Sequence, residues 1–270
     1  MDLPQQDPPT TTSTSSPYNP TPADTLLVRS YLSRLNLPTE LALAIIDFAQ
    51  YYPLARGHTL GNFTIAASTH RLNSAALLLV VSDPIPSGTK GERLKPRSVK
   101  FKLRSHDQGW GGERGCRGRV PSHSFHYIGT YSGSYTWFEA CILRPLPTTS
   151  TSTSTSRPAL TLPYTFNPYP TAVCLRPVGF DLVHCSASSR ETAVMWHIQS
   201  NVCASSEEKV HEVEWRRGAV QEIEPGKGIG KDFVEKLRPG DRVGVWARAL
   251  YPGWVNHVKE VGVEIVVEVD

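Results

Sequence analysis

Two stretches of this 270-residue chain share one outline, and this repeat constrains the fold more than any other feature. The segment VGVWARALYPGW, residues 243–254, matches VKFKLRSHDQGW, residues 99–110, at four of twelve positions. Each copy begins with apolar residues at alternate positions, the pattern of a half-buried β-strand, and ends in a Gly-Trp pair that is typical of a turn. The sequence therefore predicts that one strand-and-turn unit is used twice.

Further strands are indicated along the chain. The clearest is residues 258–269, in which five β-branched side chains alternate with other residues and share one face: Val261, Val263, Ile265, Val267 and Val269. Short strands separated by turn residues are typical of an all-β domain. The expected fold class is therefore mainly β: a jelly-roll-like or related two-sheet β-sandwich with internal duplication, preceded by a short helical pair. The alternative layout is two separate four-stranded domains, each of which would be small without disulfides or metal.

Composition divides the chain into parts. Residues 1–23 and 147–157 consist almost wholly of Pro, Thr, Ser and other polar residues. Such segments cannot bury enough apolar surface to offset the entropy lost on ordering. We therefore expect a disordered tail at 1–23, a helical segment at 24–53, and a duplicated β-sandwich at 58–270 that carries a low-complexity insertion.

The helical segment resembles a known docking motif. Helical periodicity begins at Asp24, a suitable cap, and a second helix is expected after Pro38. The run from Leu37 to Tyr52 resembles the opening of an F-box, with its Leu-Pro-x-Glu-Leu start and its Ile/Leu-rich helix. This resemblance implies a Skp-type adaptor as partner, bound through Leu37, Pro38, Leu41, Ile45 and Phe48. The alternative is a helical pair that only packs on the following domain.

A second resemblance covers most of residues 37–269. The run LRPGDRVGVWARALYPGWVNHV, together with SHDQGW and GTYSGSYTWFEA, resembles segments that recur in a group of filamentous-fungal proteins, sometimes behind an F-box-like start. The group implies no activity. A looser similarity, in the order of parts only, is to the sugar-binding sandwich that follows the F-box in some ubiquitin-ligase receptors. The ligand expected for the sandwich is therefore a protein or a glycan.

The Gly-Trp turns supply the candidate ligand-binding residues. Trp110 and Trp254 could form an aromatic platform for a sugar ring or an apolar side chain, or could close the end of the sandwich. We expect Trp254 to be structural, because apolar residues flank it, and Trp110 to be exposed. His106 and Asp107 could bind a ligand or orient a general base, although an aspartate in a turn commonly stabilises that turn. The candidates are Trp110, His106 and Asp107 around the first Gly-Trp turn, together with Trp137, which lies outside these turns.

Motifs for chemistry are weak. His123 and His126 have a spacing that can serve a metal, yet no cysteine or carboxylate lies at a recognised distance from them. The glycines and lysines of residues 226–231 lack the spacing of a phosphate loop, and no motif for a nucleophile is present. We therefore expect no metal, no cofactor and no catalytic residue, and a recognition protein rather than an enzyme.

Charge and cysteine content set the expected compartment. The net charge of +3 comes from 28 basic and 25 acidic residues, which does not imply a nucleic-acid partner. A basic run that includes Lys100, Lys102 and Arg104 alternates with apolar residues, which favours a solvated strand face over a patch for an anionic partner. The five cysteines form no Cys-x-x-Cys pair, and no apolar run approaches the roughly 20 residues that span a bilayer. We expect a protein of the cytoplasm or nucleus that binds neither membrane nor nucleic acid.

Overall fold

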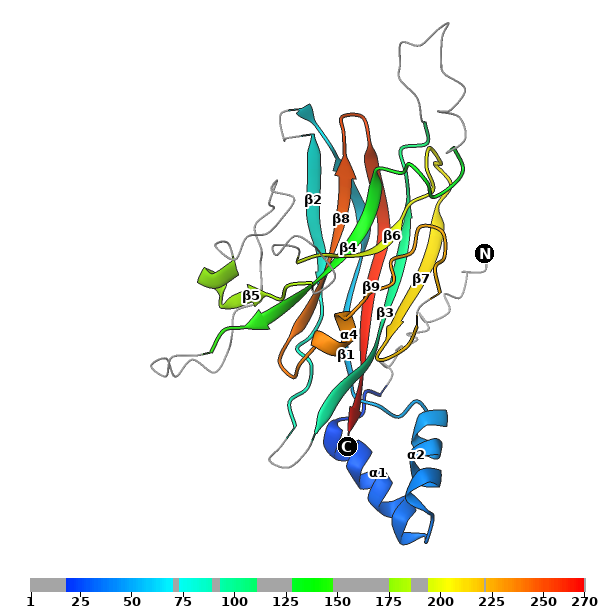
Figure 1. Ribbon diagram of the computed structural model, residues 1–270, viewed down its shortest axis with the longest axis vertical. Coiled ribbons are helices and arrows are strands. Elements are labelled where there is room, and N and C mark those ends of the chain that lie inside the picture. The colour runs from blue at the N-terminus through cyan, green and yellow to red at the C-terminus, as the bar shows by residue number, and fades with distance from the viewer. Residues whose placement is uncertain are drawn as a thin grey trace, which may run out of the picture.

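The computed structural model describes residues 18–69, 73–88, 93–110, 128–147, 175–185, 194–220 and 222–269. Over these residues the protein is mainly β, with two antiparallel sheets packed together and two short helices at the N-terminal side (Figure 1). The fold class expected from the sequence is therefore confirmed.

The helical elements are α1 (Pro22–Arg34), α2 (Thr39–Phe48), the 3-10 turn η3 (Arg176–Val178) and the one-turn helix α4 (Phe233–Lys236). The strands are β1 (Leu54–Ala66), β2 (Ser74–Val81), β3 (Leu94–His106), β4 (Thr136–Pro145), β5 (Phe180–Leu182), β6 (Trp196–Ser200), β7 (Lys209–Arg216), β8 (Arg242–Leu250) and β9 (Val255–Val269).

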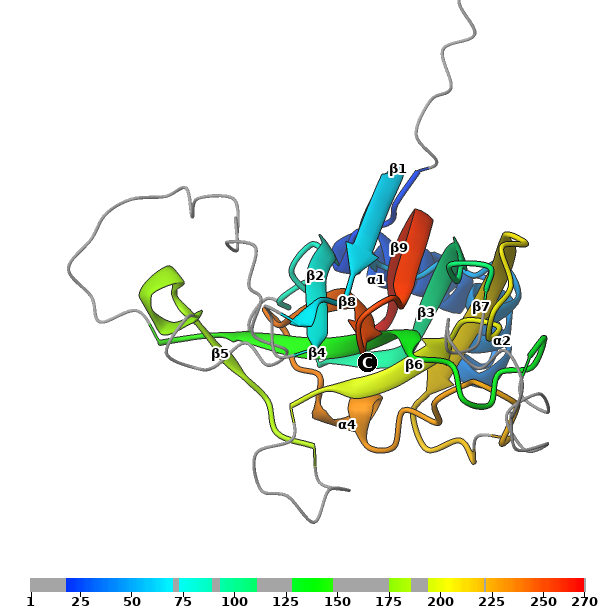
Figure 2. The same ribbon diagram turned by 90° about the horizontal axis from the view of Figure 1, so that it is seen from above.

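The strand order is that of a jelly roll. Sheet A has the order β1-β9-β3-β7, and sheet B has the order β2-β8-β4-β5, with β6 also paired to β4. Apart from β4, β5 and β6, which are neighbours in sheet B, successive strands alternate between the sheets. Figure 2 shows the two sheets as adjacent layers. Because strands from both halves of the sequence lie in each sheet, the chain forms one sandwich rather than two small domains.

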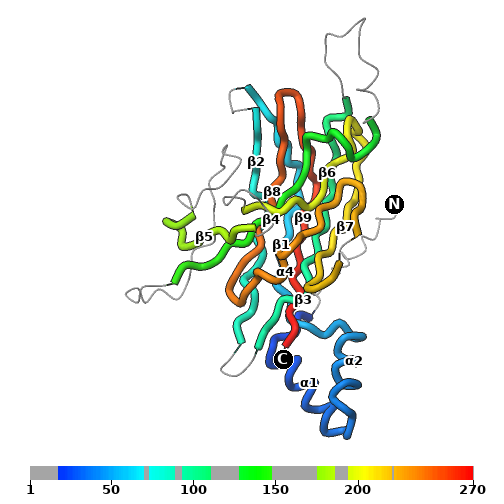
Figure 3. Tube along the Cα trace, in the orientation of Figure 1, coloured from blue at the N-terminus to red at the C-terminus, as the bar shows by residue number. Residues whose placement is uncertain are grey.

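The core lies between the sheets. The inner face of β9 contributes all five of its alternating β-branched side chains, and aromatic residues fill the space near β7 and α4. Val266, on the opposite face of β9, is buried for another reason, because it packs against Ile46 of α2 and Tyr52. Figure 3 shows β9 running from the far end of the sandwich to the helix pair.

The two copies of the repeated unit form β3 and β8, which belong to different sheets. Each strand is followed by a glycine with positive φ, +83° at Gly109 and +94° at Gly253. Residues with side chains rarely adopt these angles, so the glycine is required for the turn before each tryptophan. The local outline is thus repeated although the sheet partners differ.

The start of α1 and the residues just before it differ from expectation. Helix α1 begins at Pro22, and Thr21 rather than Asp24 is its N-cap. Asp24 completes a capping box, because its carboxylate accepts the Thr21 backbone N–H at 2.9 Å. Asn19 also exchanges two hydrogen bonds with the backbone of Leu54, so residues 18–23 are held in place rather than belonging to a tail. Residues 1–17 and the insertion beyond residue 147 lie outside the described residues.

The sandwich also begins earlier than residue 58, because β1 starts at Leu54. Gly57 and Gly61 look like strand breakers in the sequence, yet both lie inside β1. A Cβ atom on Gly57 would come within 2.8 Å of the Val81 carbonyl oxygen. Because Gly57 has no side chain, the start of β1 can lie close to the end of β2.

Candidate functional site

The turn between β8 and β9 lies at the end of the sandwich opposite the helices (Figure 1), and an aromatic cluster forms around this turn. Its members, which we call the aromatic end, are Trp110, Tyr135, Tyr251 and Trp254. The Tyr135 ring packs edge-on against Tyr251 at 4.8 Å and against Trp254 at 5.1 Å. Trp110 borders the second turn, since a Cβ atom on Gly253 would lie 3.0 Å from its ring. The two Gly-Trp turns therefore meet.

Exposure differs between the two repeated tryptophans. Trp110 is 48% exposed, whereas Trp254 is half-buried and packs against Tyr135. This is the order expected from their sequence neighbours. Tyr135 and Tyr251 are also exposed, so the cluster presents ring faces and edges to solvent.

Asp107 is directed into the protein. Its carboxylate accepts the Gln108 backbone N–H at 2.6 Å and the Ala204 backbone N–H at 2.9 Å. Burial raises the pKa of Asp107 to about 6, although these two N–H groups favour the charged form. The side chain therefore ties the turn after β3 to the connection between β6 and β7, and it does not face solvent.

His106 is half-buried beside the aromatic end. Its Nδ1 lies 2.7 Å from the Asp107 carbonyl oxygen, and its ring stacks on His257 with centroids 4.7 Å apart. Partial burial and the nearby His106 and Lys259 lower the pKa of His257. The structure therefore places His106 close to Trp110 at the end of β3, and one face of the His106 ring is covered by His257.

Trp137 belongs to a different surface. Its neighbours Phe138 and Ala140 enter the core, so Trp137 points to the outer face of sheet B. The indole N–H donates to Glu139 at 2.8 Å, and the Arg248 guanidinium lies 5.4 Å from the ring centroid. Arg248 also bonds Glu139 at 2.9 Å. The four ligand-binding candidates therefore do not form one site.

A buried polar network supports the aromatic end and was missed by sequence reasoning. Asn201 accepts the Ser105 hydroxyl hydrogen at 2.7 Å and donates to Thr136 at 3.0 Å and to Asn256 at 2.9 Å. All four residues are buried. Because a satisfied buried network fixes the groups that it joins, it holds both sheets in register below the turns. No local pattern marks these four residues, because they come from three strands and a loop that are far apart in the sequence.

Helix α2 has apolar side chains on two faces. Ala42 and Ile46 are buried against the rest of the protein, whereas Leu41, Ile45 and Phe48 are 52%, 43% and 94% exposed. We call these last three residues the α2 stripe. Pro38 is the exposed N-cap of α2, and Leu37 is half-buried. Three of the five residues expected at an adaptor interface thus form an uncovered apolar row.

Helix α1 continues this apolar character with exposed Leu27, Tyr31 and Leu35. The pair is fixed to the sandwich by the Ile46, Tyr52 and Val266 cluster and by an ion pair of 2.6 Å between Asp47 and Arg97. After α2 the chain runs through residues 49–53 directly into β1 without forming a third helix.

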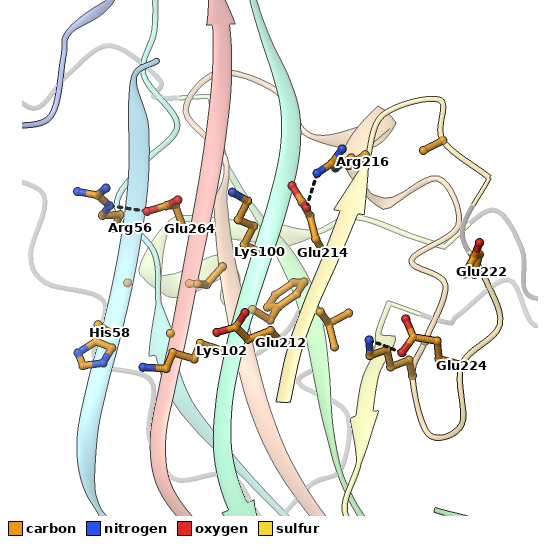
Figure 4. Close-up of a pocket in the computed structure, with 18 of the residues that line it drawn as sticks. Arg56, His58, Lys100, Lys102, Glu212, Glu214, Arg216, Glu222, Glu224 and Glu264 are labelled. Carbon is orange, nitrogen blue, oxygen red and sulfur yellow. Dashed lines mark hydrogen bonds and ion pairs between the residues drawn. The ribbon is translucent and has the colours of Figure 1, made fainter. Parts of the chain in front are cut away.

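The outer face of sheet A carries a groove of about 1370 Å³, shown in Figure 4. Its floor has charges of alternating sign across four paired strands, in the order Arg56, Glu264, Lys100 and Glu214. Lys102 bonds Glu260 at 2.9 Å, and Arg104 bonds Glu208. The basic run seen in the sequence is therefore a solvated strand face whose cations lie beside carboxylates.

The glycine-rich segment at residues 226–231 packs closely against β6. In residues 226–231, a Cβ on Gly228 would lie 1.8 Å from the His197 carbonyl oxygen, so the glycine permits close packing on β6. His123, His126 and Cys116 lie outside the described residues. Within the ranges given above, no group of three or more His, Cys, Asp or Glu residues could hold a metal ion. The same ranges contain no helix that is both long and apolar enough to cross a membrane.

Together these features define a jelly-roll β-sandwich with an apolar helical face at one end and an aromatic cluster at the other. No protein-family model matches the chain, and no curated protein matches its sequence.

Proposed function

We propose that this protein is a non-enzymatic recognition protein, an F-box-like receptor that docks a Skp-type adaptor through its helices and a target through its β-sandwich. The observation that carries the proposal is the α2 stripe, above all Phe48. A helix with one face packed on its own domain normally exposes polar residues on the other face. An uncovered row of large apolar side chains instead favours a protein partner.

The resemblance to an F-box supplies the identity of that partner. The α2 stripe consists of residues that match the motif, and they are accessible. The two-helix length favours a smaller contact than a full F-box would make. Leu27 and Tyr31 of α1 and its C-cap Leu35 are also exposed and offer additional apolar area on the helical pair.

Replacing Ile45 and Phe48 together with aspartate should abolish adaptor binding. The reason is that a large buried aromatic side chain typically dominates a protein interface, and two buried carboxylates would have no partners. The full-length protein would be mixed with a purified Skp-type adaptor and the complex measured by gel filtration and calorimetry. Both side chains are exposed, so the melting temperature of the free protein should change little.

The matched control is Val220→Asp, which changes another highly exposed apolar side chain that belongs to neither α1 nor α2. This variant should bind the adaptor as the unmodified protein does. If the unmodified protein retains no Skp-type adaptor, or if the double variant binds as well as the control, the receptor hypothesis fails.

The aromatic end favours a second candidate function, an intracellular lectin-like sandwich without a ubiquitin-ligase role. Exposed aromatic rings are suited to the apolar faces of sugar rings, and three exposed rings from separate turns meet here. On a glycan array, the full-length protein should then bind a defined set of sugars, and Trp110→Ala combined with Tyr251→Ala should remove that binding. The Ile45 and Phe48 variant serves as the control and should keep it. An array without signal, or a signal unaffected by the aromatic changes, would contradict this candidate.

A further inference from the structure

Strand β7 forms an open and regular edge of sheet A. It pairs with β3 over eight consecutive residues without a register shift, whereas the β1–β9 and β2–β8 pairings each contain one shift and the β3–β9 pairing contains two. The opposite edge is less regular, because the Asp83 backbone N–H bonds the Arg56 carbonyl of β1 at 2.7 Å and the β1 register shifts between Leu60 and Phe63. A straight edge strand without proline or bulge is a template for another strand.

The main chain of β7 has hydrogen-bonding capacity to offer. In the part of the chain that the structure describes, the backbone groups of His211, Glu212 and Val213 make no hydrogen bond outside the ladder with β3. Alternate residues of an edge strand direct both N–H and C=O away from the sheet. At least one of these three residues therefore presents both groups to the space beside β7.

That space is part of the groove in Figure 4, between β7 and the connection to which residues 217–220 and 222–228 belong. Carboxylates stand on both sides of it, Glu212 and Glu214 on the strand and Glu222 and Glu224 on the connection. Arg216 pairs with Glu214, and Lys227 pairs with Glu224. No ion pair involving Glu212 or Glu222 is formed among the described residues. Val220, which is 98% exposed, adds an apolar contact on the same wall.

We propose that β7 binds an extended segment of a partner protein as an additional β-strand, and that this segment carries lysine or arginine at alternate positions. The main chain of the segment would complete the open edge, and its basic side chains would lie opposite the carboxylates of Glu212 and Glu214 and near Glu222. The inference rests on the proposed recognition of a protein by the sandwich, and it names the site and the chemical class of the target. Because the whole chain has a net charge of +3, it does not attract a basic segment over long distances. The attraction must come from the carboxylates beside β7.

Other occupants fit less well. Antiparallel pairing of two copies through β7, centred on Val213, would set Glu212 opposite Glu214 of the second copy. Like charges directly opposite each other on a sheet are destabilising. Residues 1–17 of the chain contain no lysine or arginine and four prolines, so they lack both the charge and the backbone donors that a strand here requires.

The test uses the full-length protein and a fluorescein-labelled dodecapeptide of alternating threonine and lysine. Its affinity would be measured by fluorescence anisotropy and compared with that of the threonine and glutamate equivalent. We expect the lysine peptide to bind at least about tenfold more tightly, equivalent to about 1.4 kcal/mol. Equal affinities, or no binding of the lysine peptide at millimolar concentration, would overturn the proposal.

Two further measurements separate strand addition from simple charge attraction. N-methylation of every lysine or of every threonine removes alternate backbone donors, and one of these two peptides should lose binding while the other keeps it. The lysine peptide should also slow amide hydrogen exchange in residues 209–216 but not in β1. If both methylated peptides bind equally, or if amide protection appears elsewhere than in residues 209–216, the proposal of an added strand is wrong.

A charge-reversal variant localises the site. Glu212→Lys should weaken the lysine peptide about tenfold, because an attraction becomes a repulsion across the new strand pair. Glu207→Lys is the matched control, since Glu207 is exposed but does not line the groove. An unchanged affinity for Glu212→Lys, in a variant that melts like the unmodified protein, would refute the site. Adaptor binding through the α2 stripe is measured separately, so failure of the peptide test leaves that result intact.

Discussion

A chain that ends at residue 257 is expected to lose its cooperative thermal unfolding transition altogether. The truncation removes most of β9, which lies between β1 and β3 and buries five β-branched side chains on its inner face. Burial of each such side chain contributes about 1.5 to 3 kcal/mol. The sum is comparable to the roughly 5 to 15 kcal/mol by which a whole domain is stable. Circular dichroism and one-dimensional proton NMR would show a molten or aggregated product.

The control for this truncation is Glu264→Gln in the full-length chain, on the solvent face of the same strand. Glu264 pairs with Arg56 at 2.8 Å, and both side chains are about one third exposed. Loss of such a pair costs up to about 1 kcal/mol, so the variant should remain folded. A soluble, cooperatively folded product ending at residue 257 would show that β9 is peripheral.

Trp215→Ala is expected to cost about 3 to 5 kcal/mol of unfolding free energy, the range for removal of a buried large aromatic side chain. Trp215 is only 1% exposed and packs against Phe101 at 4.8 Å and Phe233 at 4.9 Å. Its indole N–H also donates to the Gly228 carbonyl at 2.8 Å, so the variant leaves that carbonyl without its partner. The melting temperature should fall by about 10 °C in thermal denaturation.

Trp254→Ala and Trp110→Ala provide the graded comparison. Replacement of the half-buried Trp254 should lower the unfolding free energy less than replacement of Trp215 does. Replacement of Trp110, which is 48% exposed, should lower it least. This order separates tryptophans that close the core from one that is available to a ligand. A larger loss of stability for Trp110→Ala than for Trp254→Ala would reverse the assignment of the two repeated residues.

Sequence patterning predicted those parts of the fold in which one strand face is buried and the other solvated. The inner side chains of β9 and the alternation in β3 could be predicted because successive side chains of a strand point to opposite faces of the sheet. The start of β1 was missed because Gly57 reads locally as a breaker, while its reason lies in the approach of Val81 across the sandwich. The start of α1 was missed because the segment around Thr21 is rich in proline, which favours an irregular chain. The capping box that Thr21 forms with Asp24 was not recognised.

The candidate surfaces were predictable to a lesser degree because they depend on contacts between distant segments. The exposure of the α2 stripe follows from which face Ile46 uses to reach β9, and no local pattern distinguishes two apolar faces. Asp107 is held by Ala204, 97 residues later in the sequence. Likewise, the open edge of β7 exists only because of the sheet order, which pairs strands far apart in the chain.

The position of β9 also determines when the protein can fold. The earlier strands β1 and β3 are not neighbours in sheet A, and both pair with β9, which residues 255–269 form and which is synthesised after them. During synthesis, most of the sandwich therefore leaves the ribosome with its apolar faces uncovered. Folds that depend on such distant pairings form slowly, over milliseconds to seconds, and their unfinished chains are prone to aggregation. Chaperones that hold nascent chains should consequently affect the yield of this protein more than that of a helical protein of equal length.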